Sequence, residues 1–266
     1  MKKRFVFLMM TGFMFIAACH CPRQCQTSDS VKNQELLMAT LYFQRAAENR
    51  ALYYQAFNIA RERIITATTS WNGTKKLAVV VDIDETVLDN SPWEAKSILE
   101  GFSYPDKWQE WTNMGVADPT AGAVDFLNFA TSKGVEVFYI TNRKTDEKEG
   151  TLKNLIEKGF PCADEAHLLL RVAESNKEAR RQTVSQHYEI ILLMGDNLND
   201  LSDVFEKANP ENRDQLTDSL KSEFGRRFIV LPNPMYGDWE SALLKYQYNF
   251  TAAQKDSIRK AALRPF

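Results

Sequence analysis

Four short apolar runs, each followed at once by polar residues, constrain the fold of this chain most strongly. The runs cover residues 77–81, 135–140, 190–194 and 228–231, and helical patterns lie between them. Continuous apolar runs of this length are typical of strands buried on both faces, and their alternation with helices predicts an α/β fold with a parallel sheet. Ligands bind beyond the carboxyl ends of the strands in such sheets, so we expect the polar residues that follow the runs to share one site.

Helical patterns flank this predicted core on both sides. Apolar residues recur at helical spacing over 31–70 without Gly or Pro, which predicts one long helix or two helices. A stretch at about 238–263 has the pattern of two shorter helices. We therefore expect a helical subdomain made from an N-terminal segment, 31–75, and a C-terminal segment, 237–266, beside a core over 76–236.

The first part of the chain has the pattern of a bacterial lipoprotein leader. A positively charged start precedes an apolar run over 5–16, which has the length of a signal-peptide core rather than of a membrane span. The run ends in Ala-Ala-Cys, which resembles the lipobox; this resemblance implies that a signal peptide, 1–18, is removed and that Cys19 is acylated. Residue 20 is His, not the Asp associated with inner-membrane retention, so we expect an outer-membrane lipoprotein, tethered through 19–30 and placed on its periplasmic or surface side.

The charge of the chain argues against one class of partner. Its 266 residues carry a formal net charge of −2. Proteins that bind nucleic-acid polymers usually present a strongly basic face, so we expect no such polymer as a partner.

Two carboxylates, Asp82 and Asp84, follow the first apolar run in the segment Asp-Ile-Asp-Glu-Thr. A carboxylate nucleophile can attack phosphorus and form an aspartyl-phosphate, which divides a hydrolysis into two easier steps. A second carboxyl group two residues later can protonate the leaving oxygen and then activate water. The pair is therefore a candidate for phosphoryl chemistry, although an acidic turn after a strand can also be only a solvated loop.

Three further polar groups complete such a site: Thr141-Asn142-Arg143 after the second run, Lys177 before the third, and Asp196 with Asp200 after it. A hydroxyl and an ammonium group can bind phosphate oxygens, whereas several carboxylates would repel them. A divalent cation must therefore bridge the carboxylates, and Mg²⁺ suits carboxylate oxygen ligands.

Together these segments resemble the class C acid phosphatases of the haloacid-dehalogenase (HAD) superfamily, which include the lipoprotein e(P4) 5'-nucleotidases. The likeness extends from about residue 30 to the C-terminus and includes Leu-Pro-Asn-Pro-Met-Tyr-Gly-Asp-Trp at 231–239. It implies a HAD-like Rossmannoid core with a helical subdomain, and a Mg²⁺-dependent hydrolysis of phosphomonoesters at mildly acid pH. Some members are homodimers, so the resemblance makes a second copy of the chain a candidate partner.

The resemblance also implies a catalytic role for four residues. Asp82 is the expected nucleophile, and Asp84 is the expected general acid and base. Thr141 and Lys177 are expected to bind the phosphoryl oxygens.

The metal ligands implied by the resemblance come from the same acidic segments. They are the carboxylates of Asp82 and Asp196 and the backbone carbonyl of Asp84, whose side chain must stay free for proton transfer. We expect Asp200 to pair with Lys177 and to orient it.

Two aromatic residues are candidates for binding a nucleotide base. In the lipoprotein nucleotidases that this chain resembles, two aromatic residues sandwich the base, and Trp108 and Tyr236 stand at the matching positions. Stacking is worth about 1–3 kcal/mol per base and tolerates every base. The resemblance implies 5'-nucleotides or nicotinamide mononucleotide as substrates. The alternative is that Trp108 is a core residue that pins a loop. Asn142 and Arg143 are candidates for substrate contact or for positioning the second motif.

Two other functions stay open at this point. The same fold could transfer phosphate to an alcohol rather than to water. A surface lipoprotein could also bind haem or another ligand without catalysis, but the complete set of Asp82, Asp84 and Lys177 argues for an enzyme. Cys162 and His167 lie outside the motifs, and we interpret both as structural residues.

Overall fold

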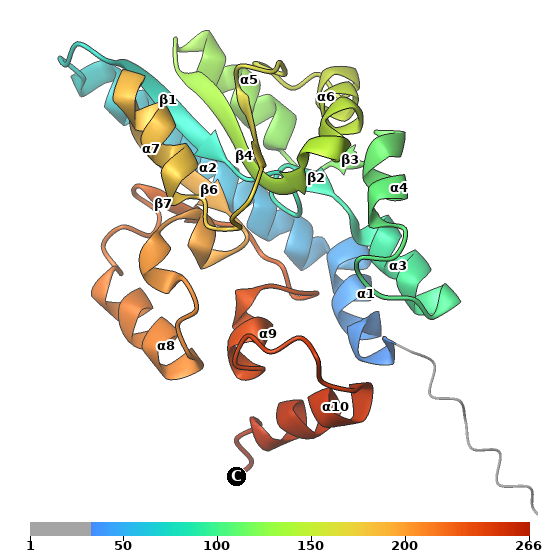
Figure 1. Ribbon diagram of the computed structural model, residues 1–266. Coiled ribbons are helices and arrows are strands. Elements are labelled where there is room, and N and C mark those ends of the chain that lie inside the picture. The colour runs from blue at the N-terminus through green and yellow to red at the C-terminus, as the bar shows by residue number, and fades with distance from the viewer. Residues whose placement is uncertain (1–32) are drawn as a thin grey trace, which may run out of the picture. The chain divides into compact units, whose positions relative to one another are not determined.

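A central parallel sheet organises residues 33–266, the part of the chain that the structure, a computed structural model, describes (Figure 1). The sheet has five strands, in the order β5 (Leu168–Arg171), β4 (Glu136–Lys144), β1 (Lys76–Val81), β6 (Tyr188–Gly195) and β7 (Phe228–Val230). All neighbouring pairs are parallel, as predicted, so the strands end at one common edge. The predicted signal peptide (1–18), the predicted lipidation site Cys19 and the linker over 19–30 lie outside the described residues.

The four predicted strands are confirmed, and β5 is an additional strand at one edge of the sheet. Three of its four residues are only partly buried, so it does not have the pattern of a strand covered on both faces. β4 extends beyond its apolar run to Lys144. Thr141 and Arg143 therefore lie within this strand rather than after it.

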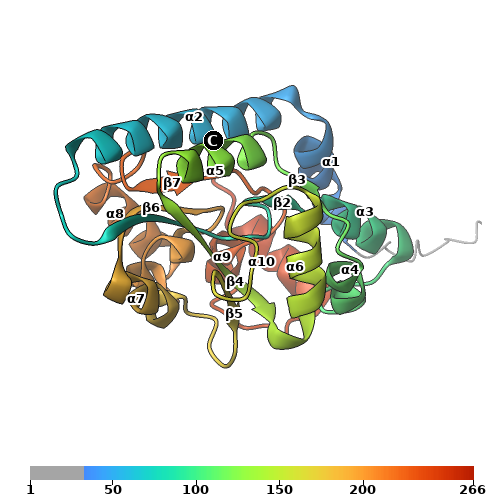
Figure 2. The ribbon, with the colours of Figure 1, turned by 90° about the horizontal axis from the view of Figure 1, so that it is seen from above.

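Alternate residues of β1 face two different layers. Val79 and Val81 belong to a large apolar core, whereas Ala78 and Val80 belong to a smaller core on the other face. Helices α2 (Ala47–Ser70) and α5 (Ala123–Ser132) pack on the first face (Figure 2). Helix α7 (Glu178–His187) packs on the second face. Since β1 is central and buried on both faces, the residue that follows it starts from a rigid position.

A segment between β1 and α5 adds two short strands and two helices beside the sheet: β2 (Leu88–Asp89), α3 (Ser91–Glu100), α4 (Trp108–Met114) and β3 (Asp118–Pro119). β2 and β3 form a separate antiparallel pair. Further helices connect strands of the central sheet. Between β4 and β5 lie η2 (Thr145–Glu147) and α6 (Lys148–Glu157), and between β6 and β7 lie η3 (Leu198–Asp200), η4 (Asp203–Phe205) and α8 (Pro210–Ser219).

The predicted N-terminal helical segment is made of two main helices. After a short 3-10 helix, η1 (Gln34–Leu36), the chain forms α1 (Leu37–Arg45), and extended backbone at Ala46 separates α1 from α2. Asn49 holds this bend, because its Nδ2 donates a 3.1 Å hydrogen bond to the carbonyl oxygen of Phe43. The bend lets α1 pack against α3 while α2 stays on the sheet.

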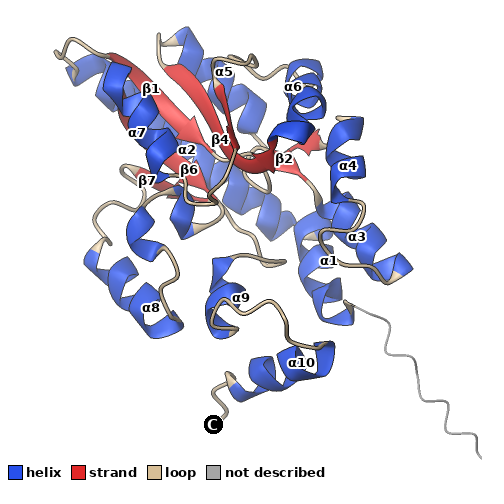
Figure 3. Cartoon of the chain, viewed as in Figure 1, coloured by secondary structure: helices blue, strands red, loops and turns tan. Residues whose placement is uncertain are grey.

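The C-terminal segment contains the two predicted helices, α9 (Asp238–Leu243) and α10 (Ala252–Ala261), seen in Figure 3. Arg259 of α10 forms ion pairs with Glu240 at 2.5 Å and with Glu35 at 2.9 Å. The N-terminal and C-terminal segments are therefore in contact; the boundaries of a helical subdomain stay a prediction. Within residues 33–266, no helix combines the length and the apolar character needed to cross a membrane.

Candidate active site

A tight turn after β1 places the first carboxylate at the common edge of the strands. Asp82 follows the last residue of β1, and its N–H group donates a 2.9 Å hydrogen bond to the carbonyl oxygen of Met194 in β6. The turn closes on the carbonyl oxygen of Ile83, which accepts from the N–H groups of Val87 and Leu88, each at 2.9 Å. These main-chain bonds hold Asp82 in place without using its side chain.

Glu85 stabilises this turn from inside. Its backbone is left-handed (φ 55°), its side chain is fully buried, and its carboxylate accepts a 2.7 Å hydrogen bond from the N–H group of Asn90. The hydroxyl of Tyr53 donates to the carbonyl oxygen of Glu85. Burial, and then the charges of Asp84 and Asp196, raise the pKa of Glu85 well above its ordinary value.

Three carboxylates from two segments, one after β1 and one after β6, converge beside the turn. Asp82, Asp196 and Asp200 each offer one oxygen, and these oxygens all lie within 4.8 Å of one another. Gly195 permits this close approach, because a Cβ atom at that position would lie 2.3 Å from Asp200 Oδ2. Asn233, in the loop after β7, donates a 2.8 Å hydrogen bond from Nδ2 to Asp196 Oδ2.

Lys177 lies directly before α7 and supplies the positive charge of this cluster. Its Nζ forms ion pairs with Asp82 Oδ1 and, at 2.7 Å, with Asp200 Oδ1. Burial acts to lower the pKa of Lys177, but the charges of Asp200 and Asp82 outweigh it, and the pKa is raised. The lysine is therefore charged, and the structure places Asp200 beside it as the sequence predicts.

The charges of this cluster do not balance within the protein. Three carboxylates and one ammonium group leave two negative charges. Burial raises the pKa of Asp82 to about 7, with Asp200 and Asp84 adding to the rise and Lys177 opposing it. Burial and the charges of Asp200 and Asp82 also raise the pKa of Asp196 well above its usual range. A hard divalent cation fits both the oxygen donors and the missing charge.

Asp84 is held separately from this cluster, and all its close donors act on one oxygen. Arg143 donates to Asp84 Oδ1 from Nε at 2.9 Å and from Nη2 at 2.7 Å, and Asn90 Nδ2 donates to the same atom at 2.9 Å. The other oxygen, Oδ2, has Thr141 Oγ1 at 3.5 Å as its nearest described donor. Asp84 Oδ2 is therefore the oxygen that can exchange a proton.

Arg143, a predicted substrate contact, is 2% exposed. Besides Asp84, its guanidinium reaches Thr151 Oγ1 at 3.1 Å and Asn90 Oδ1 at 3.3 Å. All the hydrogen bonds that the structure describes for this side chain go to protein groups, so the geometry favours the positioning role over direct contact with substrate.

The neighbouring residues of β4 are arranged differently. Thr141 is fully buried, and its Oγ1 accepts a 3.1 Å hydrogen bond from the N–H group of Arg143. Asn142 is exposed, and its Oδ1 accepts from Arg180 Nη2 at 2.8 Å. Arg180 also donates from Nη1 to the carbonyl oxygen of Thr141 at 2.5 Å, so it fixes the end of this motif.

Trp108 begins α4 at the side of the site where Asp84 lies. One turn further along the helix, Trp111 Nε1 donates a 2.8 Å hydrogen bond to Asn90 Oδ1, which ties α4 to the Asp84 turn. Trp108 itself is half-buried and packs edge-on against Trp93, with ring centroids 5.4 Å apart. It is therefore part of an aromatic cluster but retains an exposed surface.

Tyr236 is connected to the acidic cluster through Asn233. It is half-buried, and its N–H group donates to Asn233 Oδ1 at 3.4 Å, while Asn233 Nδ2 bonds Asp196. Asn233 thus connects Tyr236 to Asp196, whereas Asn90 connects Asp84 to Trp111, in the same helix as Trp108.

Four polar residues of the site were not assigned a role from the sequence: Thr86, Asn90, Arg180 and Asn233. Thr86 is fully buried, its Oγ1 accepts from the N–H group of Asp196 at 3.1 Å, and it lies 3.3 Å from Asp82 Oδ2. All four occur within or beside the recognised motifs. A polar residue next to a motif was the available signal, but sequence spacing does not show where its side chain points.

Comparison with known proteins agrees with this geometry. Residues 18–239 match the family described as HAD superfamily, subfamily IIIB (Acid phosphatase), and the chain belongs to this family. It is similar to the class C acid phosphatase from Bacillus anthracis, with 44% identity over 87% of this chain and 98% of that chain, and a TM-score of 0.85. A structure of the Bacillus anthracis class C acid phosphatase with tungstate bound is 45% identical over the same shares, with a TM-score of 0.85.

Family and fold together establish the class of enzyme. The protein is an acid phosphatase of the HAD type, and its reaction is the hydrolysis of phosphomonoesters. Phosphatases of this superfamily generally use a divalent metal, and Asp82, Asp196 and Asp200 form an aspartate-rich site of that kind. The predicted fold class and enzyme class are confirmed.

Proposed function

We propose that the protein hydrolyses 5'-nucleotides through an aspartyl-phosphate on Asp82, with Mg²⁺ as its cofactor. One observation carries this proposal: Asp82 shares a buried cluster with Lys177, Asp196 and Asp200, whereas Asp84 is held outside it with one free oxygen. Two carboxylates two residues apart thus have different surroundings, which suits two different roles.

In the first half of the proposed reaction, a carboxylate oxygen of Asp82 attacks phosphorus and the ester P–O bond breaks. Asp84 gives the proton on Oδ2 to the leaving oxygen. In the second half, Asp84 accepts a proton from water as the water oxygen attacks phosphorus. Phosphate leaves, and the carboxylate of Asp82 is restored.

The surrounding residues hold the reacting groups. Lys177 binds Asp82 and offsets the charge of the phosphoryl oxygens, and the Thr141 hydroxyl is the proposed donor to one of them. Arg143 occupies Asp84 Oδ1, which leaves Oδ2 for proton transfer. Asp200 orients Lys177 rather than contacting substrate.

The donor set also fits the proposed cofactor. Mg²⁺ would be held by the carboxylates of Asp82 and Asp196 and by the backbone carbonyl of Asp84. Its chemistry there would be to neutralise the carboxylates and to polarise the phosphoryl group. The tungstate in the Bacillus anthracis class C acid phosphatase supports a site for tetrahedral oxyanions in this fold, because tungstate resembles phosphate in shape and charge.

Recognition of a nucleotide base is the less direct part of the proposal. The helix of Trp108 is tied through Trp111 to Asn90 beside Asp84, and Tyr236 is tied to Asn233 beside Asp196. Both aromatic residues therefore border the site, which supports a base held between two aromatic faces. We expect Trp108→Ala to raise KM for adenosine monophosphate, while glycerol phosphate, which has no ring, is hydrolysed as before. An equal loss with both substrates would exclude stacking on Trp108.

We also propose that Cys19 carries a lipid and anchors the enzyme to the outer membrane. The support is the lipobox of the sequence, in which two alanine residues precede Cys19 after an apolar run. Incorporation of labelled palmitate should be lost in Cys19→Ser. Labelling that persists in this variant would refute the assignment.

The direct test of the function is phosphate release from a panel of 5'- and 3'-nucleotides, nicotinamide mononucleotide and nitrophenyl phosphate, with Mg²⁺ and with EDTA. We expect metal-dependent release that favours 5'-nucleotides and is abolished in Asp82→Asn. Metal-dependent release without preference would keep the phosphatase and remove the base sandwich. Full activity of Asp82→Asn would remove the proposed nucleophile.

A further inference from the structure

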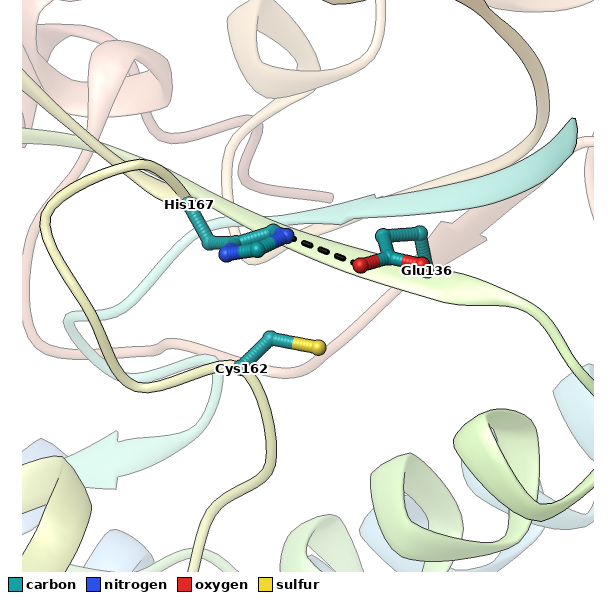
Figure 4. Close-up of side chains that lie close together, drawn as sticks. All are labelled: Glu136, Cys162 and His167. Carbon is teal, nitrogen blue, oxygen red and sulfur yellow. Dashed lines mark hydrogen bonds and ion pairs between the residues drawn. The ribbon is translucent and has the colours of Figure 1, made fainter.

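A second group of metal-ligating side chains lies away from the active site. Glu136, Cys162 and His167 each offer one donor atom, and the three atoms lie within 4.8 Å of one another. Figure 4 shows these side chains together, with Glu136 and His167 joined by a hydrogen bond. Glu136 is the first residue of β4, five residues before Thr141, so the group lies roughly 16 Å along the strand from the catalytic edge.

The geometry of His167 suits a metal ligand. Its Nδ1 lies 2.7 Å from Asp164 Oδ1, and its Nε2 lies 3.0 Å from Glu136 Oε1. A carboxylate on one ring nitrogen, with the other nitrogen directed at the ligand group, is the usual arrangement around metal-bound histidine. The ring also packs on Phe138, with centroids 4.9 Å apart, which fixes its plane.

The backbone holds the loop that carries Cys162 and His167 against β4. The N–H group of Tyr139 donates to the carbonyl oxygen of His167 at 2.9 Å, and the Tyr139 hydroxyl donates to the carbonyl oxygen of Pro161 at 2.6 Å. Cys162, the next residue, has a left-handed backbone (φ 52°). The three donor atoms are thus brought together by fixed backbone rather than by flexible surface side chains.

The distances are close to those of a tetrahedral zinc site. Zinc–nitrogen and zinc–oxygen bonds of about 2.0–2.1 Å place two such ligands about 3.3 Å apart, and a thiolate at about 2.3 Å lies about 3.6 Å from each. The pair of Glu136 and His167 is at 3.0 Å, and the upper limit of 4.8 Å for Cys162 requires a movement of about 1 Å. The side chains of Glu136 and His167 are 30% and 16% exposed, so a cation can reach them.

We propose that Glu136, Cys162 and His167 form a binding site for a borderline-soft divalent metal of the zinc class, with Asp164 orienting the imidazole. Thiolate and imidazole donors select such metals over Mg²⁺, which prefers the all-oxygen donors of the active site. Three protein ligands leave a fourth position for water. The bound metal joins the loop before the edge strand β5 to the start of β4, and it therefore stabilises this side of the sheet. The site does not depend on the phosphatase mechanism.

This proposal replaces the interpretation of Cys162 and His167 as purely structural residues. Burial, together with the charges of Glu136 and Asp164, raises the pKa of the Cys162 thiol. A metal ion binds the thiolate, so binding at Cys162 displaces the thiol proton.

The test uses Co²⁺ as a probe, because a cobalt–thiolate bond gives a near-ultraviolet charge-transfer absorption that oxygen ligands do not give. In the full chain with Cys19, Cys21 and Cys25 replaced by Ser, Cys162 is the remaining thiol of the four. We expect this band at one equivalent of Co²⁺ with Mg²⁺ in excess, its loss in Cys162→Ser, and at least tenfold weaker binding in His167→Gln. No band in the parent protein, or a band that persists in Cys162→Ser, would overturn the proposal.

A second measurement covers the case in which a variant folds poorly. Zn²⁺ should raise the Tm of the parent protein by several degrees and raise that of Asp164→Asn less at the same concentration, because loss of the orienting carboxylate weakens binding about 10–100-fold. Phosphate release by Asp164→Asn should be unchanged, since Asp164 is not part of the active site. Equal increases of Tm in the parent protein and in Asp164→Asn would show that zinc binds at another site and would refute the proposal.

Discussion

Replacing Arg143 by Lys is expected to impair proton transfer by Asp84 more than any other step. The Arg143 side chain is 1% exposed, and its Nε and Nη2 donate to Asp84 Oδ1 at 2.9 and 2.7 Å. Lysine keeps the positive charge but loses the planar fork, so it cannot hold Asp84, Thr151 and Asn90 at once. The Asp84 carboxylate then rotates, and Oδ2 no longer stays free for the substrate.

Two magnitudes follow from these contacts. A buried acceptor that loses its donor costs about 1–3 kcal/mol, so we expect Arg143→Lys to lower the free energy of unfolding by roughly that amount. General acid catalysis by a positioned group is worth about 10²–10⁴-fold, and misplacing the acid should remove a large part of this. We therefore expect kcat/KM, which reports the steps up to release of the leaving group, to fall at least about tenfold for glycerol phosphate. Nitrophenyl phosphate, whose leaving group needs little protonation, should lose much less of its kcat/KM.

The assay compares kcat/KM for the two substrates at a temperature well below the Tm of the variant. Asp84→Asn is the matched control and should show the same dependence on the leaving group. The double variant should be little worse than Asp84→Asn alone, since both changes act through one carboxyl group. An equal loss on both substrates, or additive losses in the double variant, would refute the positioning role of Arg143.

Three further predictions concern the acidic cluster and a buried glutamate. Gly195→Ala places a Cβ atom 2.3 Å from Asp200 Oδ2, so it should displace Asp200, cost about 1–3 kcal/mol in chemical denaturation and reduce kcat; wild-type values would contradict this. Removal of metal by EDTA should lower Tm more at pH 8 than at pH 5, because burial and then the charges of Asp200 and Asp84 raise the pKa of Asp82 to about 7 and protonation relieves the repulsion; an equal shift at both pH values would count against it. Burial and then the charge of Glu240 raise the pKa of Glu94 from 4.5 to about 7. Between these pH values the folded state keeps a proton that the unfolded state has lost, so the free energy of unfolding falls as the pH rises. Glu94→Gln should remove up to roughly 3 kcal/mol of that fall, at about 1.4 kcal/mol per pH unit, and an unchanged pH profile of unfolding would show that Glu94 does not titrate in this way.

The architecture was largely predictable because the buried strands have an unambiguous pattern. Continuous apolar runs marked β1, β4, β6 and β7, and each of these strands contributes residues to both apolar cores. β5 escaped prediction because it is a short, half-exposed edge strand. The break at Ala46 was also undetermined, since it depends on a hydrogen bond from Asn49 to Phe43 that helical periodicity does not reveal.

The site was predictable in part, for a related reason. Asp82 and Asp196 directly follow parallel strands that end at one edge, so the sheet itself brings them together. The spacing of the motifs located Lys177 and Asp200. Side-chain direction could not be predicted, so Arg143 was a candidate for substrate contact, although the structure places it on Asp84. The cluster of Glu136, Cys162 and His167 was not predicted, because Glu136 is far from the other two residues in the chain and meets them only through the pairing of β4 with β5.

The identity of the phosphorylated residue tests the central claim most directly. Asp84→Asn should form the acyl phosphate with nitrophenyl phosphate but hydrolyse it slowly, because the second half of the reaction needs a base. Acid quenching followed by borohydride reduction converts an aspartyl-phosphate to homoserine, which peptide mass spectrometry locates. We predict homoserine at position 82 in Asp84→Asn and none in Asp82→Asn. Homoserine at position 196 or 200, or at no position under conditions of measured turnover, would contradict the proposed mechanism.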